Sequence, residues 1–307
     1  MKTSSVDVLI IGGGPAGLAC AIELRALGIK DVRVVDREAD AGGVPRHSNH
    51  LGYGIRDLHR FMTGPAYAKS YVERAQKCGV TISTSTTATQ LGEGTYVDLS
   101  SPQGLERVHA KAIVLATGAR ERGRNARMIP GARPAGIYTT GSLQQALYLR
   151  HLDIGTKAVI IGAEHVSFSA LMTLSHAKVK TLAMITDQSK HSSVLGAKLL
   201  SQLIYRFRFI PSTEIVEIHG NTRVTGITIR DDQGNTSSID CDTIIFTGNW
   251  IPDYELARRG KVDSAGVFAI GNLHLPIKSA DQCAVLARKA AKAIAEHVSS
   301  APALKNG

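Results

Sequence analysis

Short apolar runs alternate with amphipathic, helix-like stretches along most of the chain, which is the pattern of α/β proteins. The first run, VDVLII from Val6, predicts a buried strand, and VRVVD (32–36) predicts the next one. Between them, a glycine-rich turn opens a helix whose apolar residues recur at helical spacing up to a stop at Gly28. The order strand, turn, helix, strand predicts a βαβ unit.

The glycines of this turn meet three separate steric needs of a dinucleotide site. Gly12 allows the tight turn, Gly14 lets the backbone approach phosphates, and Gly17 lets the helix lie close to the strand. Pro15 and Ala16 open the helix, and Pro suits a first helical turn. The free N–H groups and the positive end of the helix dipole suit a pyrophosphate.

Asp36 ends the second strand at about the ~20-residue spacing beyond the glycines at which an acid binds ribose hydroxyls. The following segment, 37–57, begins with Arg37 and is too rich in turn formers for regular structure. We expect it to lie across the dinucleotide, with a glycine at Gly43 and with Arg46 as a phosphate partner.

His47 and His50 lie in the same loop and are the candidate catalytic residues. Either ring could face the reactive part of the cofactor as a proton carrier. The alternative is that both histidines only fix the shape of the loop, since no partner carboxylate can be named. With His59 they lack the spacing of a zinc site, so no metal site is predicted.

Further along, VTISTSTTATQL (80–91) predicts two strands, and AIVLATG (112–118) predicts a buried strand. The latter ends in small residues, so a ligand can lie hard against Thr117 and Gly118. Residues 208–248 predict a β-meander of three strands with turns at Gly220-Asn221 and Asp231–Gly234, and a strong helix begins near Ser279.

The chain resembles the thioredoxin-reductase-like flavoproteins, a branch of the pyridine nucleotide-disulfide oxidoreductases. The resemblance lies in the residues that bind FAD in that family: GGGPAG, Asp36, AIVLATGA and the later GVFAIGN. The likeness covers nearly the whole chain. It implies an α/β fold of two Rossmann-like domains, the second inserted into the first. The FAD-binding domain would comprise residues 1–118 and 246–307, and the NAD(P)-binding-like domain residues 119–245.

The resemblance implies FAD as cofactor, held by residues from both ends of the chain: Gly12, Gly14, Pro15, Ala16, Gly17, Asp36, Arg37, Gly43, Arg46, Ala88, Ala116, Thr117, Gly118, Gly271 and Asn272. Asn272 stands where the family has an acid, and an amide can still hydrogen-bond to a hydroxyl. The helix after Ser279 would point its N-terminus at the flavin.

The inserted domain carries a second turn of the same kind, in KAVIIGAEHVSFSALMTL (157–174). Gly162 is present, but Glu164 and Ser167 take the second and third glycine positions. A carboxylate would then stand where pyrophosphate needs close backbone approach and positive potential. NAD(P) binding is therefore doubtful, and a degenerate, structural use of this domain is expected. His165 is open to a functional or a cap-like role.

Four arginines crowd the segment between the domains: Arg120, Arg122, Arg124 and Arg127. They either clamp a phosphate or an acidic partner, or belong to an exposed connector and pair with Glu121 and water. The next segment, IPGARPAGIYTTGSLQ (129–144), resembles the alpha subunits of opine, hydroxyproline and sarcosine-type amine dehydrogenases and of hydrogen cyanide synthase. TGPAYA (63–68) is similar to flavoproteins associated with glycerol-3-phosphate dehydrogenase-like systems.

Composition changes this picture little. The chain has 307 residues, 43% of them hydrophobic, and a formal net charge of +10. Its basic residues are dispersed without aromatic interleaving, which favours an anionic cofactor, an acidic partner or solvation over nucleic acid. No apolar run suits membrane insertion, and the first strand starts too early for a signal peptide, so we expect a cytoplasmic protein. The cysteines form no CxxC and are expected to be buried thiols: Cys20, Cys78, Cys241 and Cys283.

These features predict an FAD-dependent oxidoreductase of the dehydrogenase class, acting on an amine, an amino acid or a related small catabolic substrate. Electrons would pass to a partner rather than to free NAD(P). The partner would be a second flavoprotein or an iron–sulfur subunit, because this chain has no cysteine set for a cluster, and an oligomer is expected. The alternatives are a stand-alone NAD(P)H-dependent flavin reductase and a non-catalytic nucleotide-binding module.

Overall fold

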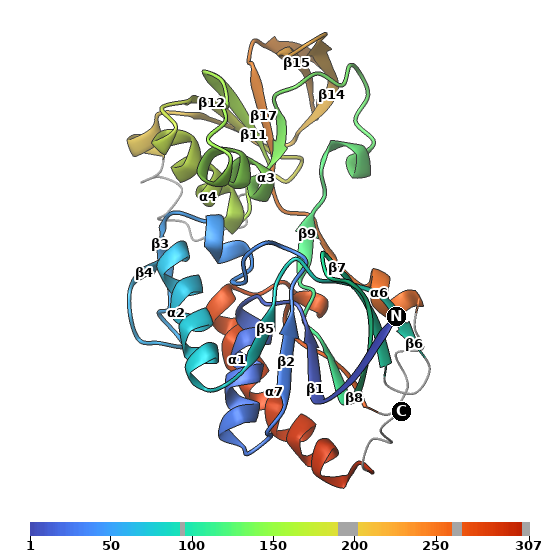
Figure 1. Cartoon of the computed structure of the whole chain (residues 1–307). Helices are drawn as coiled ribbons and strands as arrows, with labels where there is room; N and C mark the ends of the chain where they lie inside the picture. Colours follow the sequence, from blue (N-terminus) through green and yellow to red (C-terminus); the bar gives the residue numbers. More distant parts are fainter. Residues whose placement is uncertain (93–95, 190–201, 260–265, 303–307) are drawn as a thin grey trace. The chain divides into compact units, whose positions relative to one another are not determined.

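The computed structural model describes residues 1–92, 96–189, 202–259 and 266–302. The chain forms two compact units (Figure 1). The first unit comprises Met1–Arg46, Leu51–Arg120 and Pro252–Gly307, and the second comprises His47–His50 and Glu121–Ile251. Each unit is built on a mainly parallel sheet with helices against it, so the predicted α/β class is confirmed. No pattern in the sequence indicated that residues 47–50 group with the second unit.

The first unit contains a seven-stranded sheet, in which the central strands β2, β1 and β8 run parallel. The path runs β5 (Thr81–Ser83), β2 (Val32–Val35), β1 (Lys2–Ile11), β8 (Gly104–Leu115), β7 (Tyr96–Ser101) and β6 (Thr87–Gly92), and β19 (Val267–Ala269) also pairs with β8. Strands β6 and β7 form an antiparallel extension of the sheet. The carboxyl ends of β1, β2 and β8 therefore meet at one edge, which is where open α/β sheets bind ligands.

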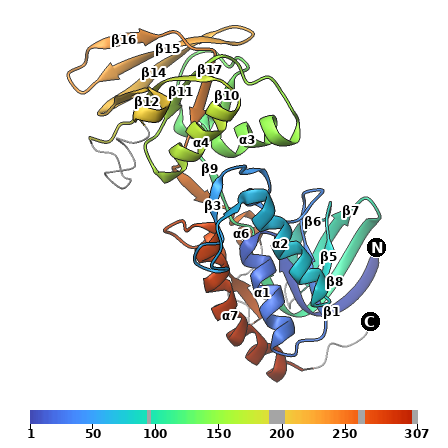
Figure 2. The same cartoon turned by 90° about the vertical axis from the view of Figure 1, so that its left-hand side faces the viewer.

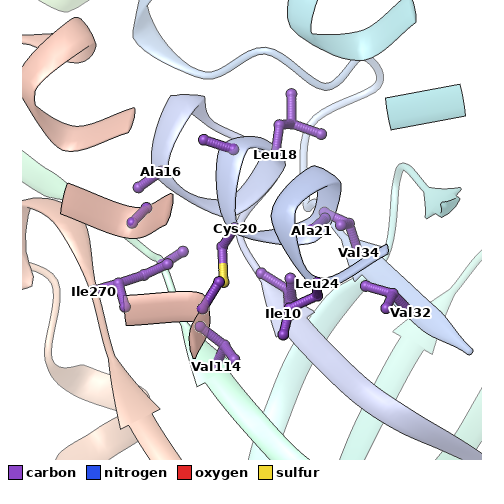
Figure 3. Close-up of a cluster of buried hydrophobic side chains, with 14 of the residues drawn as sticks. Ile10, Ala16, Leu18, Cys20, Ala21, Leu24, Val32, Val34, Val114 and Ile270 are labelled. Atoms are coloured by element: carbon purple, nitrogen blue, oxygen red, sulfur yellow. The ribbon is translucent and has the colours of Figure 1, made fainter. Parts of the chain in front are cut away.

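Three helices of the first unit pack on one face of this sheet: α1 (Pro15–Ala26), α2 (Gly64–Lys77) and α7 (Ala280–Ser300) (Figure 2). The core between α1 and the strands is fully buried, with Leu24 of α1 against Ile10 and Val114 of β1 and β8 (Figure 3). Burying each such side chain stabilises the fold by roughly 1.5–3 kcal/mol. The same core fixes the start of α1 at the strand ends. On the other face lies α6 (Glu255–Arg259), and a short hairpin, β3 (Leu51–Tyr53) and β4 (Met62–Thr63), precedes α2.

A buried charged cluster ties α2 to α7. Tyr67 and Tyr71 donate their hydroxyls to one oxygen of Asp57, at 2.6 and 2.7 Å. Arg288 of α7 donates to the Tyr71 hydroxyl at 2.8 Å and lies 3.7 Å from the Asp57 carboxylate. Burial, with the hydrogen bond to Asp57, raises the pKa of Tyr71 to about 12, so this hydroxyl stays a donor at neutral pH. The cluster holds the loop before β4 against both helices.

The second unit has a five-stranded parallel sheet and a separate antiparallel meander. The parallel order is β10 (Ile137–Thr139), β17 (Thr243–Phe246), β11 (Lys157–Ile161), β12 (Lys180–Ile185) and β13 (Arg208–Ile210); the meander is β14 (Thr213–Gly220), β15 (Val224–Asp231) and β16 (Thr236–Ile239). Its described helices include α3 (Thr140–Gln144), which continues into a π-helical turn at Gln145–Leu149, and α4 (His165–His176). The connecting strands β9 (Ala119–Glu121) and β18 (Trp250–Pro252) pair with each other. The meander predicted over 208–248 is confirmed for β14, β15 and β16, but the two ends of that segment form β13 and β17 of the parallel sheet instead.

Two sequence-based expectations need correction. Cys78 is exposed rather than buried, because it caps the C-terminus of α2 instead of lying within the helix. The segment after Asp36 is not wholly irregular, since it contains a 3₁₀ turn at Val44–His47 as well as β3. The segment SVLGAKLLSQLIYRF (193–207) also predicts a helix, and most of this segment lies outside the described residues. No helix in the described part of the chain is both long and apolar enough to cross a membrane.

Replacing Asp57 with alanine should destabilise the first unit, because it leaves Arg288 and two buried hydroxyls without their acceptor. We expect the free energy of unfolding in urea to fall by about 3 kcal/mol or more. The exposed Asp232→Ala variant loses the same charge and should stay within about 0.5 kcal/mol of the wild type. Equal stability of the two variants would show that the Asp57 cluster contributes nothing.

Candidate functional site

The glycine turn of the first unit is closed by contacts that leave no room for side chains. The Gly12 N–H donates to the Val35 carbonyl at 2.9 Å. Gly12 has a φ of +111°, and a Cβ there would lie 2.4 Å from the Ala116 carbonyl oxygen. A Cβ on Gly17 would lie 2.0 Å from the Gly12 carbonyl oxygen. Both glycines are therefore required for α1 to begin directly against β1 and β8.

Gly14, in contrast, has room for a Cβ without a clash. The nearest atom to a Cβ built on Gly14 is the Gly43 Cα, at 3.8 Å. Gly14 is the N-cap of α1, and no side chain caps the helix there. Pro15 and Ala16 form the first turn of the helix. The N–H groups at the start of the helix have no partner within the helix, and no capping side chain lies in front of them. This arrangement can accept a phosphate at hydrogen-bond distance.

Asp36 presents its carboxylate beside the same turn. The Gly13 N–H donates to one oxygen at 2.8 Å, and the Glu38 N–H donates to the other at 2.9 Å. Burial raises the pKa of the Asp36 carboxyl, and the two backbone donors oppose that shift. Each oxygen keeps a further lone pair, so the group can still accept hydrogen bonds from two hydroxyls.

The loop after Asp36 lies on the glycine turn. The Gly42 N–H donates to the Gly13 carbonyl at 2.7 Å. Gly43 has a φ of +64°, and a Cβ there would lie 2.9 Å from the Gly14 Cα. The backbone of this loop thus packs directly against Gly14, so the loop and the start of α1 would both border a ligand bound there.

The two arginines predicted at this site already have acidic partners. The Arg46 guanidinium lies 3.5 Å from the carboxylates of both Glu38 and Asp40. Arg37 is largely exposed and lies 3.9 Å from Asp253. A phosphate bound to Arg46 would have to share it with these carboxylates, so backbone N–H groups are the better anion donors here.

Hydrogen bonds join the residues that follow β8 to the segment at Asp253. The Thr117 hydroxyl donates to the Asp253 carbonyl at 2.8 Å, and the Asp253 N–H donates to the Gly118 carbonyl at 2.9 Å. Gly118 has a φ of +77°, and no atom lies within 4 Å of a Cβ built there. Ala88 lies in β6, in register with Leu99. Thr117 and Gly118 therefore hold the chain where it leaves β8, in addition to any contact that they make with a ligand.

Gly271 and Asn272 bring the last segment to the start of α1. A Cβ on Gly271 would lie 2.8 Å from the Ala16 Cβ. The Asn272 side chain accepts from the Lys278 N–H at 2.8 Å and donates to the Lys278 carbonyl at 3.0 Å. This amide therefore shapes the loop before α7, a role that the sequence did not suggest. At the start of α7, Gln282 accepts from the Ser279 N–H at 3.1 Å.

His47 and His50 belong to the second unit, whereas the glycine turn belongs to the first. His50 Nε2 lies 2.8 Å from the Ser169 hydroxyl and 2.9 Å from the Ser48 hydroxyl. Gln144 donates to the Ser169 hydroxyl at 2.8 Å. Nothing in the pattern around Gln144 or Ser169 singled them out. Proton transfer by the two histidines stays a prediction.

The second glycine turn holds a carboxylate. Glu164 accepts a hydrogen bond from the Thr247 hydroxyl at 3.0 Å. Glu121 lies at the same strand ends, where it accepts from the N–H groups of Gly141 at 2.9 Å and Gly248 at 3.2 Å. Burial raises the pKa of the Glu121 carboxyl, and these donors oppose the rise. Glu121 and Thr247 were not recognised as site residues, because their partners are distant in sequence.

The connector arginines are partly structural. Arg124 is buried and donates to the carbonyls of Ile129 and Gly131, at 3.1 and 2.6 Å. Arg127 donates to the carbonyls of Thr247 and Gly248. Burial lowers the pKa of Arg127, and the nearby Glu164 and Glu121 carboxylates oppose that change. An exposed connector is therefore the wrong description for Arg124.

Comparison with known proteins gives the family. A model of the pyridine nucleotide-disulphide oxidoreductases matches residues 6–276, so the chain belongs to this family. An alkyl hydroperoxide reductase subunit from Xanthomonas campestris pv. phaseoli is 26% identical over 299 residues, covering 87% of this chain and 52% of the relative. An opine oxidase subunit from Agrobacterium tumefaciens (strain Ach5) is 29% identical over 194 residues, which cover 60% of this chain and 37% of the relative. The chain thus spans about half, or less, of these relatives' length.

A solved structure supports the fold. Thioredoxin reductase from T. acidophilum superposes with a TM-score of 0.76 over 96% of this chain and 99% of that chain, at 20% identity. The predicted two-domain Rossmann architecture and the predicted family are both confirmed. Family membership makes the chain a flavoprotein oxidoreductase.

Asp36→Ala should weaken FAD binding, because the variant lacks the charged acceptor that the sequence predicts for the ribose hydroxyls. A hydrogen bond to a charged group contributes about 1.5–3 kcal/mol, so we expect the Kd for FAD to rise about tenfold to a hundredfold. Flavin fluorescence titration of the flavin-free protein measures this. Glu73→Ala removes an exposed carboxylate of α2 and should leave the Kd unchanged; an unchanged Kd in the Asp36 variant would refute the ribose role.

Proposed function

We propose that the chain is an FAD-dependent dehydrogenase or electron-transfer subunit that oxidises an amine, an amino acid or a related small catabolic substrate. Its electrons would leave through a partner protein rather than through free NAD(P). One observation carries the proposal: the two units contain the same kind of turn, open at Gly14 in the first and filled by the Glu164 carboxylate in the second. The first turn suits a dinucleotide, and the second opposes one.

The residues of the first unit suit FAD in particular ways. The open backbone at Gly14 and the uncapped start of α1 would hold the pyrophosphate, and Asp36 would hold the ribose of the adenosine half. Gly43 and Gly271 would border the cofactor, because both approach the start of α1 too closely for a side chain. When bound, the flavin supplies the hydride-accepting and electron-releasing chemistry. The protein would bind the flavin and orient its reactive ring.

The substrate class rests on resemblance. The segment 129–144 is similar to the alpha subunits of amine dehydrogenases, and one relative is named as a subunit of opine oxidase. Another relative is named as a subunit of alkyl hydroperoxide reductase. These names support a chain that works with other subunits.

The cysteines support a partner in electron transfer. Burial raises the pKa of Cys20 and Cys241 to about 12 and that of Cys283 to about 11, so all three remain protonated thiols. Among the described residues, no three or more His, Cys, Asp or Glu side chains gather as metal ligands. A second flavoprotein or an iron–sulfur subunit would therefore carry the electrons onward.

Anaerobic mixing of the FAD-loaded protein with candidate donors tests this function. Proline, hydroxyproline, sarcosine and an opine form the substrate panel, and NADH and NADPH are added in parallel at equal concentration. We expect at least one member of the panel to bleach the visible absorbance of the flavin and an artificial dye to restore it, while NADH and NADPH leave it unchanged.

The opposite outcomes identify the alternatives. Rapid bleaching by NADH or NADPH would instead establish a flavin reductase. A flavin that no donor reduces, and that no acceptor reoxidises after chemical reduction, would indicate a non-catalytic nucleotide-binding module.

A further inference from the structure

The two turns have matching backbones, so their residues can be compared one by one. The Gly162 N–H donates to the Ile185 carbonyl at 2.8 Å, as the Gly12 N–H does to Val35 at 2.9 Å. Gly162 has a φ of +127°, against +111° for Gly12. The Thr247 N–H donates to the Ile161 carbonyl at 2.9 Å, as Ala116 does to Ile11 at 2.8 Å. Glu164 is thus the counterpart of Gly14, as each is the N-cap of its helix.

The Glu164 side chain folds back over the strand ends instead of pointing away. Its Oε2 lies 2.7 Å from a Cβ built on Gly162, and its Cδ lies 2.5 Å from a Cβ built on Gly248. These two glycines follow β11 and β17, the central strands of the sheet. The carboxylate therefore covers the point where such sheets bind a pyrophosphate.

Specific partners hold the carboxylate there. Thr247 donates to Oε2 at 3.0 Å, and the fully buried Ser167 has its hydroxyl 3.4 Å from the same oxygen and 2.7 Å from the Thr247 hydroxyl. Ser167 is the counterpart of Gly17, so its side chain occupies the third glycine position. The guanidinium of Arg127 lies at the same strand ends and balances the acidic charge.

A dinucleotide phosphate meets two obstacles at this turn. The carboxylate fills the space that the phosphate needs, and its negative charge repels the phosphate. Both of these obstacles come from the Glu164 side chain, and the hydrogen bonds that shape the second turn match those of the first.

We infer that Glu164 determines the coenzyme specificity of this chain: its carboxylate takes the place of the pyrophosphate in the second unit and thereby excludes NAD(P). This inference rests on the proposed function, in which electrons bypass free NAD(P), and it names the residue responsible. Glu164 makes no side-chain cap hydrogen bond to α4, so glycine is tolerable at this N-cap.

Isothermal titration of the FAD-loaded protein with NADH and with NADPH tests the inference. The variants are Glu164→Gly, which removes bulk and charge, and Glu164→Gln, which removes only the charge. Asp232→Gly is the control, since it removes an exposed carboxylate of the second unit. We expect no saturable binding to the wild type or the control. Glu164→Gly should bind at least one coenzyme saturably, at least about tenfold more tightly than the weakest affinity that the titration can detect, and Glu164→Gln should lie between Glu164→Gly and the wild type.

Two results would overturn the inference. One is wild-type affinity equal to that of Glu164→Gly. The other is absence of binding to both Glu164 variants when their circular dichroism and FAD content match the wild type. If Glu164→Gly does not fold, Glu164→Gln decides alone, by gaining affinity or failing to gain it. The substrate panel tests the proposed function separately: a flavin that no substrate bleaches would refute that function while leaving the coenzyme result standing.

Discussion

The structure of the candidate site depends on one close approach, in which the start of α1 meets the ends of β1 and β8 with no side chain between them. A Cβ on Gly17 would lie 2.0 Å from the Gly12 carbonyl oxygen, so even alanine would push the helix away. Because the helix starts so close to the sheet, the Gly13 N–H reaches Asp36 and the loop at Gly43 lies on Gly14. The open backbone at the helix start is the result of these contacts.

The second unit has the same turn backbone with a different side chain at its centre. Its turn repeats the hydrogen bonds of the first, yet Glu164 places a carboxylate where the first turn has space. A fold family thus supplies an anion-binding geometry, and a single side chain can reverse its electrostatics. The buried Ser167 and the nearby Arg127 show that the packing around the turn is consistent with the carboxylate.

Local features of the fold were predictable from the sequence, and long-range pairings were not. The helix α1 and the spacing of Asp36 from the glycines can be recognised in the sequence. Hydrophobic periodicity and turn chemistry act over only a few positions, so they are visible locally. The hydrogen bond from the Gly248 N–H to Glu121 joins residues 127 positions apart, so no local pattern encodes it. Arg46 shows a different limit: its residue type suggested a phosphate, but its neighbours in space are two carboxylates.

Residues 47–50 give the second unit an interior that is discontinuous in sequence. Ser48 is only 2% exposed, and it neighbours Gln144, which is equally buried. A fragment cut to residues 121–251 would lack this four-residue piece and expose polar groups that the intact unit covers. The segment 121–251 is therefore not a complete unit by itself. Exchange of the segment between β9 and β18 during evolution would require matching changes in the loop at residues 47–50, which lies about seventy positions earlier in the chain.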